Sequence, residues 1–108
     1  MRIDAIDSFA KDIKALKKKY RSIDSDFEKF IESLLEDPFQ GDGLGNDCYK
    51  VRMAIESKNK GKSGGARVIT CVKIINETIY LLSIYDKSSQ STITDKALNG
   101  LLKEAGIE

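Results

Sequence analysis

The sequence contains no histidine and no tryptophan, and it has one proline and two cysteines among 108 residues. The absence of histidine excludes His-based catalytic triads, most zinc sites and the usual general base near neutral pH. If the chain is an enzyme, its chemistry must therefore rest on Lys, Arg, Tyr, Asp and Glu. We predict neither a metal site nor a cofactor.

Long hydrophobic runs are also missing, and none approaches the roughly 18 residues that a membrane-spanning helix needs. The N-terminal stretch carries Asp4 and Asp7 and lacks the apolar segment of a signal peptide. Cys48 and Cys71 have no metal-ligand spacing, and we expect them to be reduced and packed in the interior rather than joined in a disulfide. These features predict a cytoplasmic protein made of a single domain, residues 1–108.

The net charge of +1 conceals one strongly basic segment. Residues 48–73 hold seven basic residues and one acid, whereas residues 1–47 and 74–108 carry net charges of −3 and −2. A polyanion responds to the local field of such a cluster rather than to net charge, so the pattern favours a nucleic-acid partner. A basic strand face and loop that only interact with water are the alternative.

The N-terminal part of the chain begins with a short strand candidate and continues with helical periodicity. Residues 2–6 predict the strand. Apolar residues then recur at three- and four-residue steps over residues 9–20, which predicts an amphipathic helix. We expect Asp7 or Ser8 to cap its N-terminus.

A second amphipathic helix is expected directly after the first, so the pair would form a helical hairpin. Residues 25–28 fit a capping box, and apolar positions over residues 27–35 form the buried stripe. Pro38 marks the end of this helix. Residues 37–47 hold three glycines and the proline, and this composition predicts a loop.

From residue 48 onward the hydrophobic period changes from helical spacing to alternation. Residues 48–57 alternate apolar and basic side chains, which predicts a half-buried strand with a basic exposed face. Residues 66–75 and 78–85 are apolar and rich in β-branched side chains, which predicts two central strands. We expect a hairpin turn between them at residues 76–77.

The last predicted element is a helix that starts near Thr92 or Thr94 and ends at Gly106. The order of elements is therefore one strand, two helices, three antiparallel strands and a helix. This order predicts an α+β fold, in which a small antiparallel sheet has the N-terminal helical hairpin packed on one face and is followed by the C-terminal helix.

The stretch SKNKGKSGGARVI, residues 57–69, contains a Gly-Lys-Ser triplet of the kind found in phosphate-binding loops. A P-loop would need its first glycine at position 56, where the sequence has Glu56, and a helix after the triplet, where a strand is expected. Both departures exclude a P-loop. A flexible connection between two strands is the simplest interpretation, but it does not explain the basic residues of the flanking strands.

Three segments in order, CYKVRMA, KGKSGGARVI and LLSIYDKS, resemble the RelE/ParE toxin superfamily and most closely its HigB-like branch. The resemblance extends over essentially the whole chain and implies a RelE-like fold. It further implies a type II toxin–antitoxin toxin, a metal-independent, ribosome-dependent mRNA endoribonuclease (an mRNA interferase) that inhibits translation. Two alternatives remain, namely a ParE-like toxin that acts on DNA gyrase and a non-catalytic RNA-binding module.

The resemblance also implies a catalytic set on the concave face of the sheet. Its members are the basic residues Lys50, Arg52, Arg67 and Lys87, with Tyr85 as a substitute for the family tyrosine, since Ile93 occupies that position here. Arg67 suits stabilisation of a phosphorane because a guanidinium offers two parallel hydrogen bonds. Lys50 is then the expected base, and Lys87 or Tyr85 the acid. The expected contacts to the RNA backbone are Lys58, Lys60, Lys62 and Lys73.

The resemblance implies two partners, which are the ribosome with its mRNA and a cognate antitoxin of the helix-turn-helix type. Neutralisation is expected to cover the basic face or to displace the C-terminal helix. The apolar side of that helix consists of Ala97, Leu98, Leu101 and Leu102. Packing in the hydrophobic core is the simpler role for these four residues.

Overall fold

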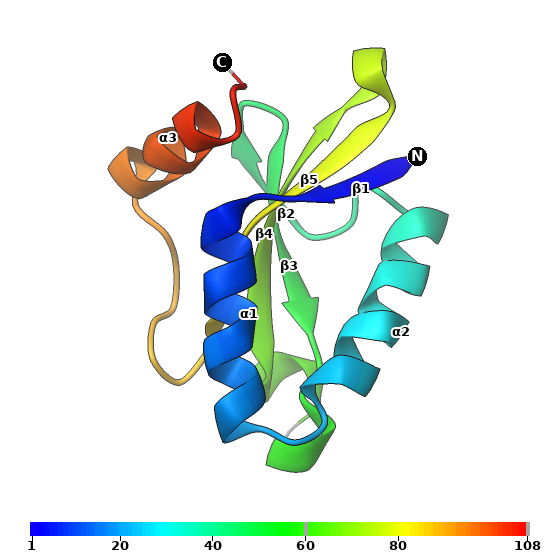
Figure 1. Cartoon of the computed structure of the whole chain (residues 1–108), viewed down its shortest axis with the longest axis vertical. Coiled ribbons are helices and arrows are strands. Elements are labelled where there is room, and N and C mark those ends of the chain that lie inside the picture. Colours follow the sequence, from blue (N-terminus) through cyan, green and yellow to red (C-terminus); the bar gives the residue numbers. More distant parts are fainter. Residues whose placement is uncertain (60, 108) are drawn as a thin grey trace.

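The protein is described by a computed structural model that covers residues 1–59 and 61–107 (Figure 1). Its strands and α-helices are β1 (Arg2–Ala5), α1 (Asp7–Lys19), α2 (Ile23–Glu36), β2 (Asp42–Gly45), β3 (Cys48–Met53), β4 (Ala66–Lys73), β5 (Thr78–Asp86) and α3 (Asp95–Glu104). No helix within the described residues is both long enough and apolar enough to cross a membrane. The predicted α+β class is confirmed.

The five strands form one mixed sheet in the order β1-β5-β4-β3-β2. Neighbours from β2 to β5 are antiparallel, as expected, but β1 runs parallel to β5. The prediction of a purely antiparallel sheet was therefore wrong for β1. The backbone amide of Arg2 donates to the carbonyl of Glu77, so β1 occupies the outer edge of β5. A four-residue strand carries no sequence signal for the direction in which it pairs.

The glycine-rich segment 37–47 is not entirely a loop, because β2 forms within it and pairs with β3. The pairing is irregular between Gly43 and Gly45. Asn46 and Asp47 both have positive φ and make the turn into β3. A strand with three turn-forming residues in four lacks the β-branched pattern from which strands are predicted, and this explains why the sequence did not indicate it.

The N-termini of α1 and α2 differ from the caps expected for them. Ile6 occupies the N-cap of α1 without a side-chain hydrogen bond, so neither Asp7 nor Ser8 caps this helix. Helix α2 begins before the box predicted at residues 25–28, which consequently lies inside the helix. The predicted start of α3 near Thr92 or Thr94 is confirmed, and the Thr94 hydroxyl accepts a hydrogen bond from a backbone amide of the first turn.

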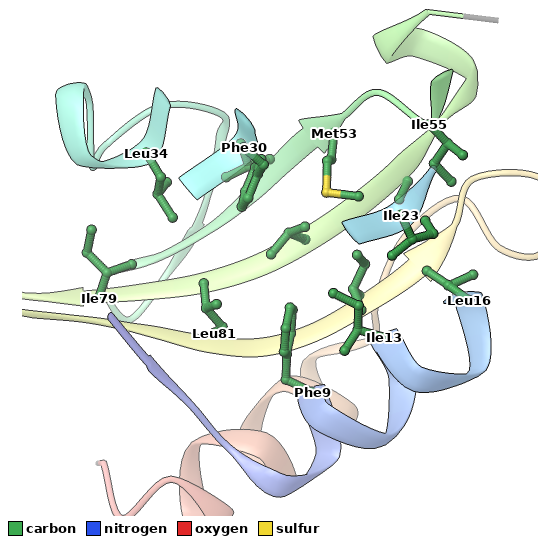
Figure 2. Packing of buried hydrophobic residues seen from close by; sticks show 14 of the residues in the cluster. Phe9, Ile13, Leu16, Ile23, Phe30, Leu34, Met53, Ile55, Ile79 and Leu81 are labelled. Carbon is green, nitrogen blue, oxygen red and sulfur yellow. The ribbon is translucent and has the colours of Figure 1, made fainter. Parts of the chain in front are cut away.

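Both faces of the sheet are covered, each by a separate hydrophobic cluster. The helical hairpin lies on one face, as predicted, and its buried side chains point at β3, β4 and β5 (Figure 2). They are Phe9, Ile13, Leu16, Ile23, Phe30 and Leu34. On the other face α3 packs Leu98 and Leu102 against Ile69, Leu82 and Tyr85. Burial of each large apolar side chain stabilises the fold by about 1.5–3 kcal/mol.

Candidate functional site

The strand register brings Lys50, Arg52 and Arg67, three of the predicted site residues, together on the sheet. Arg52 of β3 lies directly opposite Arg67 of β4, which in turn lies opposite Tyr85 of β5. Lys50 precedes Arg52 by two positions, so both side chains leave the same face of the strand. Lys50, Arg52 and Arg67 therefore share one face near the connection between β3 and β4.

A polar groove of about 350 Å³ opens beside these three residues. Its lining consists of Gln40, Gly41, Asp42, Lys50, Val51, Arg52, Lys62 and Arg67. Four of the eight lining residues are cations and one is an acid, so the groove has the charge expected of a site for a phosphate diester. Sequence reasoning identified the four cations, but it missed the wall contributed by residues 40–42.

That wall depends on a glycine. Gly41 has a φ of +98°, and a Cβ atom there would lie 2.5 Å from the carbonyl oxygen of Lys50. Only glycine permits both this backbone conformation and this close approach. The segment that follows α2 is thereby held against β3 and closes one side of the groove.

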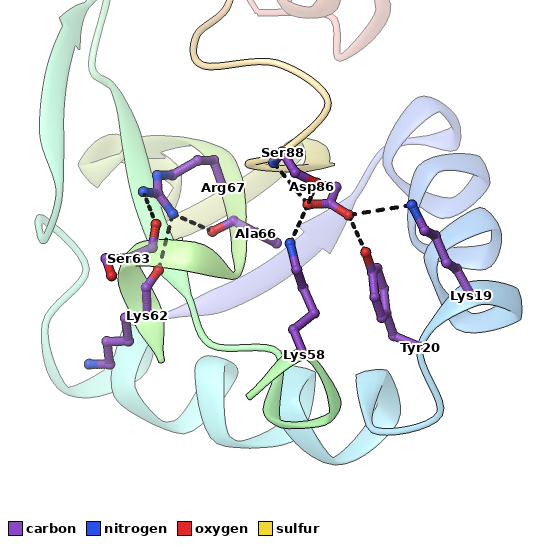
Figure 3. A network of polar contacts seen from close by, with 9 residues as sticks. All are labelled: Lys19, Tyr20, Lys58, Lys62, Ser63, Ala66, Arg67, Asp86 and Ser88. Atoms are coloured by element: carbon purple, nitrogen blue, oxygen red, sulfur yellow. Dashed lines mark hydrogen bonds and ion pairs between the residues drawn. The ribbon is translucent and has the colours of Figure 1, made fainter. Parts of the chain in front are cut away.

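Arg67 has a structural role that the sequence did not indicate (Figure 3). Its side chain is buried, and its guanidinium donates to the backbone carbonyls of Lys62, Ser63 and Ala66 at 3.0–3.1 Å. A guanidinium has five N–H donors, so two remain after these three bonds. Arg67 therefore holds the end of the β3–β4 connection in place and still lines the groove.

The β3–β4 connection, residues 54–65, is also fixed to the sheet through Gly65. A Cβ atom at Gly65 would lie 2.2 Å from the carbonyl oxygen of Met53, so no larger residue fits without a backbone shift. The Gly65 carbonyl accepts a hydrogen bond from the backbone amide of Lys87 at 3.0 Å. The Lys87 side chain is exposed and is not among the described residues that line the groove.

Tyr85 lies next to Arg67 across the sheet and is a buried member of the hydrophobic cluster that also contains Leu98 and Leu102 of α3. Its hydroxyl is buried and has no hydrogen-bond partner among the described residues. Burial raises the pKa of Tyr85, and the positive charge of Arg67 opposes this shift. The phenol therefore stays protonated at neutral pH, and Tyr85 is not among the described residues that line the groove.

Lys58, predicted to contact RNA, is instead bound to a buried carboxylate (Figure 3). Its Nζ lies 2.6 Å from Oδ1 of Asp86, and the hydroxyl of Tyr20 donates to Oδ2 of the same carboxylate. The backbone amide and hydroxyl of Ser88 complete the set of donors. The Nζ atom of Lys19 lies further away, 3.8 Å from Oδ2 of Asp86. The acid that organises this network was not identified from the sequence.

The ionisation of Asp86 is controlled by two opposing effects. Burial alone would raise its pKa, but the hydrogen bonds from Lys58, Tyr20 and Ser88 outweigh burial and hold the pKa well below its usual range. Asp86 is therefore ionised throughout the physiological pH range. The network keeps the connection between β3 and β4 attached to the end of β5.

The remaining predicted contacts to RNA lie in different places. Lys62 is exposed at the groove, and Lys60 lies outside the described residues. Lys73 ends β4, six residues from Arg67, which corresponds to about 20 Å along a strand. It forms an ion pair with Asp47 at 2.9 Å, and this hydrogen bond raises the pKa of Lys73. Lys73 is therefore remote from the groove.

The four residues predicted to face an antitoxin divide by exposure. Leu98 and Leu102 are buried on the sheet, Leu101 is half-buried and Ala97 is exposed. The two buried leucines contribute to the core in this state. They become available to a partner only if α3 leaves the sheet.

Comparison with known proteins gives a match to one family model and matches to several solved structures, two of which are E. coli RelE. A family model described as the RelE toxin of the RelE/RelB toxin–antitoxin system matches residues 4–107. A free-state mutant of the E. coli toxin RelE is 17% identical, with 94% of each chain covered and a TM-score of 0.62. A second structure, the isolated E. coli RelE toxin, is 14% identical, covers 94% of this chain and 96% of that chain, and has a TM-score of 0.52. At these identities the structural likeness shows the fold.

Proposed function

Because this chain belongs to the RelE family of toxins from toxin–antitoxin systems, we propose that it inhibits translation as a ribosome-dependent mRNA endoribonuclease. The observation that carries the proposal is the groove, in which Lys50, Arg52, Lys62 and Arg67 converge. Action on translating ribosomes places the protein in the cytoplasm. We also assign it to the HigB-like branch, on the KGKSGGAR stretch alone.

The proposed reaction is transesterification without a metal. The 2′ oxygen of one nucleotide attacks the adjacent phosphorus, the bond to the 5′ oxygen breaks, and a 2′,3′-cyclic phosphate forms. Lys50, half-buried in the groove, accepts the proton of the 2′-OH in its neutral form. Arg52 and the two Arg67 donors that bond to no described residue stabilise the charge that develops on the phosphorane.

Protonation of the departing 5′ oxygen is assigned to Lys87 rather than to Tyr85. Lys87 is exposed and follows directly on the strand that carries Tyr85, whereas the Tyr85 hydroxyl is buried beneath the α3 cluster. The exposed Lys87 ammonium is open to solvent and to a bound RNA in the present fold. Tyr85 would serve only in a conformation in which α3 or the segment before it has moved.

Dependence on the ribosome follows from the chemistry of the groove. A lysine is a poor base at neutral pH, because most of it is protonated there. Fixing the 2′-OH in line with the phosphorus supplies much of the barrier reduction that a better base would otherwise provide. A ribosome that holds mRNA in this geometry would compensate for the absence of a stronger base in the toxin.

The proposed partner that neutralises the toxin is a cognate antitoxin of the helix-turn-helix type. An acidic segment laid over the groove would compete with RNA for the same cations, and a segment that displaces α3 would expose Leu98 and Leu102. The first mode leaves the core intact. The second requires a partner that covers the apolar surface of the sheet.

Expression in growing bacteria discriminates the candidate functions. An mRNA endoribonuclease is expected to arrest growth, with primer extension detecting new 5′ ends inside coding regions and with no DNA-damage response. A gyrase inhibitor would give the reverse pattern, with intact mRNA and DNA damage. Association with ribosomes without new mRNA ends would favour a binding module, and either of these two outcomes would overturn the proposal.

A further inference from the structure

The two cysteines lie on neighbouring strands, and Cys48 precedes the groove residue Lys50 by two positions in β3. Cys48 of β3 is the direct register partner of Cys71 of β4. Both are free thiols, and their residues are 1% and 0% exposed. The proposed RNA chemistry uses neither of them.

The hydrogen-bond pattern around this pair determines how close the two residues are. The amide of Val72 donates to the carbonyl of Asp47 at 2.9 Å, and these two residues flank the cysteine pair. Cys48 and Cys71 consequently occupy a non-hydrogen-bonded position of the antiparallel ladder, where opposite Cα atoms are about 4.5 Å apart. That separation falls within the range of roughly 4.4–6.8 Å over which disulfides form.

The two sulfur atoms also converge on one acceptor. Sγ of Cys48 lies 3.4 Å from the carbonyl oxygen of Asn46, and Sγ of Cys71 lies 3.6 Å from the same atom. Side chains at opposite register positions leave the same face of a sheet, so the two thiols point into a common space. The register and the shared acceptor therefore place the two thiols next to each other.

We propose that Cys48 and Cys71 are a reversible oxidation site, at which a peroxide converts the two thiols into an intrachain disulfide between β3 and β4. The inference does not depend on the proposed RNA cleavage. A peroxide is the fitting oxidant because the thiols are buried and a small molecule reaches them with the least disturbance of the fold. The disulfide would fix the register of the strands that carry Lys50, Arg52 and Arg67.

The environment of the two sulfur atoms indicates which thiol reacts first. A hydrogen bond between the thiols lowers the pKa of Cys71 and raises that of Cys48, while burial opposes the first shift and Lys73 supports it. We assign Cys71 as the attacking thiol because Lys73 lies two positions further along the same face of β4, where its positive charge favours the nucleophilic thiolate. Cys48 acts second, as the resolving thiol.

The step balances as a two-electron reduction of the peroxide. The Cys71 thiolate attacks one oxygen of hydrogen peroxide, the O–O bond breaks, and the released hydroxide takes up a proton to leave as water. The resulting sulfenic acid is attacked by the sulfur of Cys48, the S–O bond breaks, and the second hydroxide takes up the Cys48 proton. Two thiols and one peroxide thus give one disulfide and two water molecules.

The test exposes the folded wild-type protein to hydrogen peroxide and measures its intact mass and titratable thiols. We expect a monomer lighter by two hydrogen atoms, with no titratable thiol after unfolding, a Cys48–Cys71 link in the peptide map, and full recovery by a dithiol reductant. The oxidised protein should melt about 10 °C higher, because the crosslink constrains the unfolded chain. Retention of both thiols, irreversible addition of oxygen or crosslinking between chains would overturn the proposal.

The variants Cys48→Ser and Cys71→Ser test which of the two thiols reacts first with peroxide. With Cys48→Ser the remaining thiol should accumulate sulfenic acid, which a dimedone adduct reports, and with Cys71→Ser this adduct should form about tenfold more slowly. Equal rates would contradict the assignment of Cys71 as the nucleophile. The measurement on the wild-type chain decides the disulfide itself even if neither variant folds.

Discussion

Lys58 and Asp86 form an ion pair of 2.6 Å although their side chains are only 9% and 3% exposed. Lys58 belongs to the β3–β4 connection, whereas Asp86 ends β5. The pair therefore attaches the connection that borders the groove to the end of β5. Because both charges are withdrawn from water, loss of one partner leaves the other without compensation.

Asp86→Asn is expected to lower the free energy of unfolding by about 3 kcal/mol, because it leaves the Lys58 ammonium buried without its counter-charge. Urea denaturation followed by circular dichroism measures the change. Glu32→Gln, at an exposed position of α2, is the matched control and should alter stability by less than about 0.5 kcal/mol. Equal effects of the two substitutions would show that the ion pair contributes nothing.

The depressed pKa of Asp86 predicts a loss of stability in acid. A carboxylate whose pKa is lower in the folded state stabilises the fold above its unfolded pKa of about 3.9, and this contribution is lost as pH falls towards the folded value. The free energy of unfolding should decline between about pH 5 and pH 2. Asp86→Asn should flatten this decline, and an unchanged slope in that variant would contradict the assignment.

Arg67 and Arg52 are expected to differ in what their removal does to the fold. Arg67→Ala removes three hydrogen bonds to backbone carbonyls and should lower the free energy of unfolding by about 3 kcal/mol. Arg52→Ala removes an exposed side chain and should change it by less than about 0.5 kcal/mol. Thermal melts of both variants test the difference. Equal melting temperatures would show that Arg67 does not hold the connection.

Gly65→Ala is expected to destabilise the protein by more than about 2 kcal/mol, since the added Cβ would lie 2.2 Å from the Met53 carbonyl oxygen. Gly43→Ala is the control, because a Cβ atom there meets nothing within 4 Å. Urea denaturation of both variants gives the comparison. A Gly65→Ala protein as stable as the control would mean that the connection between β3 and β4 does not pack tightly on β3.

The parts of the fold that the sequence predicted are those with a strong local pattern. The stripes of α1 and α2, the alternation of β3 and the β-branched runs of β4 and β5 all reflect burial of one or both faces, and burial is what hydrophobic periodicity reports. The parallel pairing of β1 and the strand at Asp42–Gly45 depend on contacts between distant segments. No local pattern encodes such contacts.

In the candidate site, too, the sequence predicts which residues are present but not the contacts between distant segments. The basic residues at positions 50, 52, 62 and 67 are visible in the sequence, and the structure gathers them at one groove. The sequence could not indicate that Arg67 binds three backbone carbonyls or that Lys58 faces Asp86, because both arrangements follow from the paths of residues 54–59 and 61–65. Charge patterning identifies cations without distinguishing those free to bind a phosphate from those already paired.

The central claim is tested most directly by cleavage of a defined mRNA on purified translating ribosomes. The wild-type protein and Lys96→Ala, which alters an exposed lysine of α3, are expected to cut at equal rates. Arg52→Ala is expected to cut about 100-fold more slowly while unfolding at the wild-type temperature. Undiminished cleavage by Arg52→Ala, or no cleavage by the wild-type protein, would contradict the account.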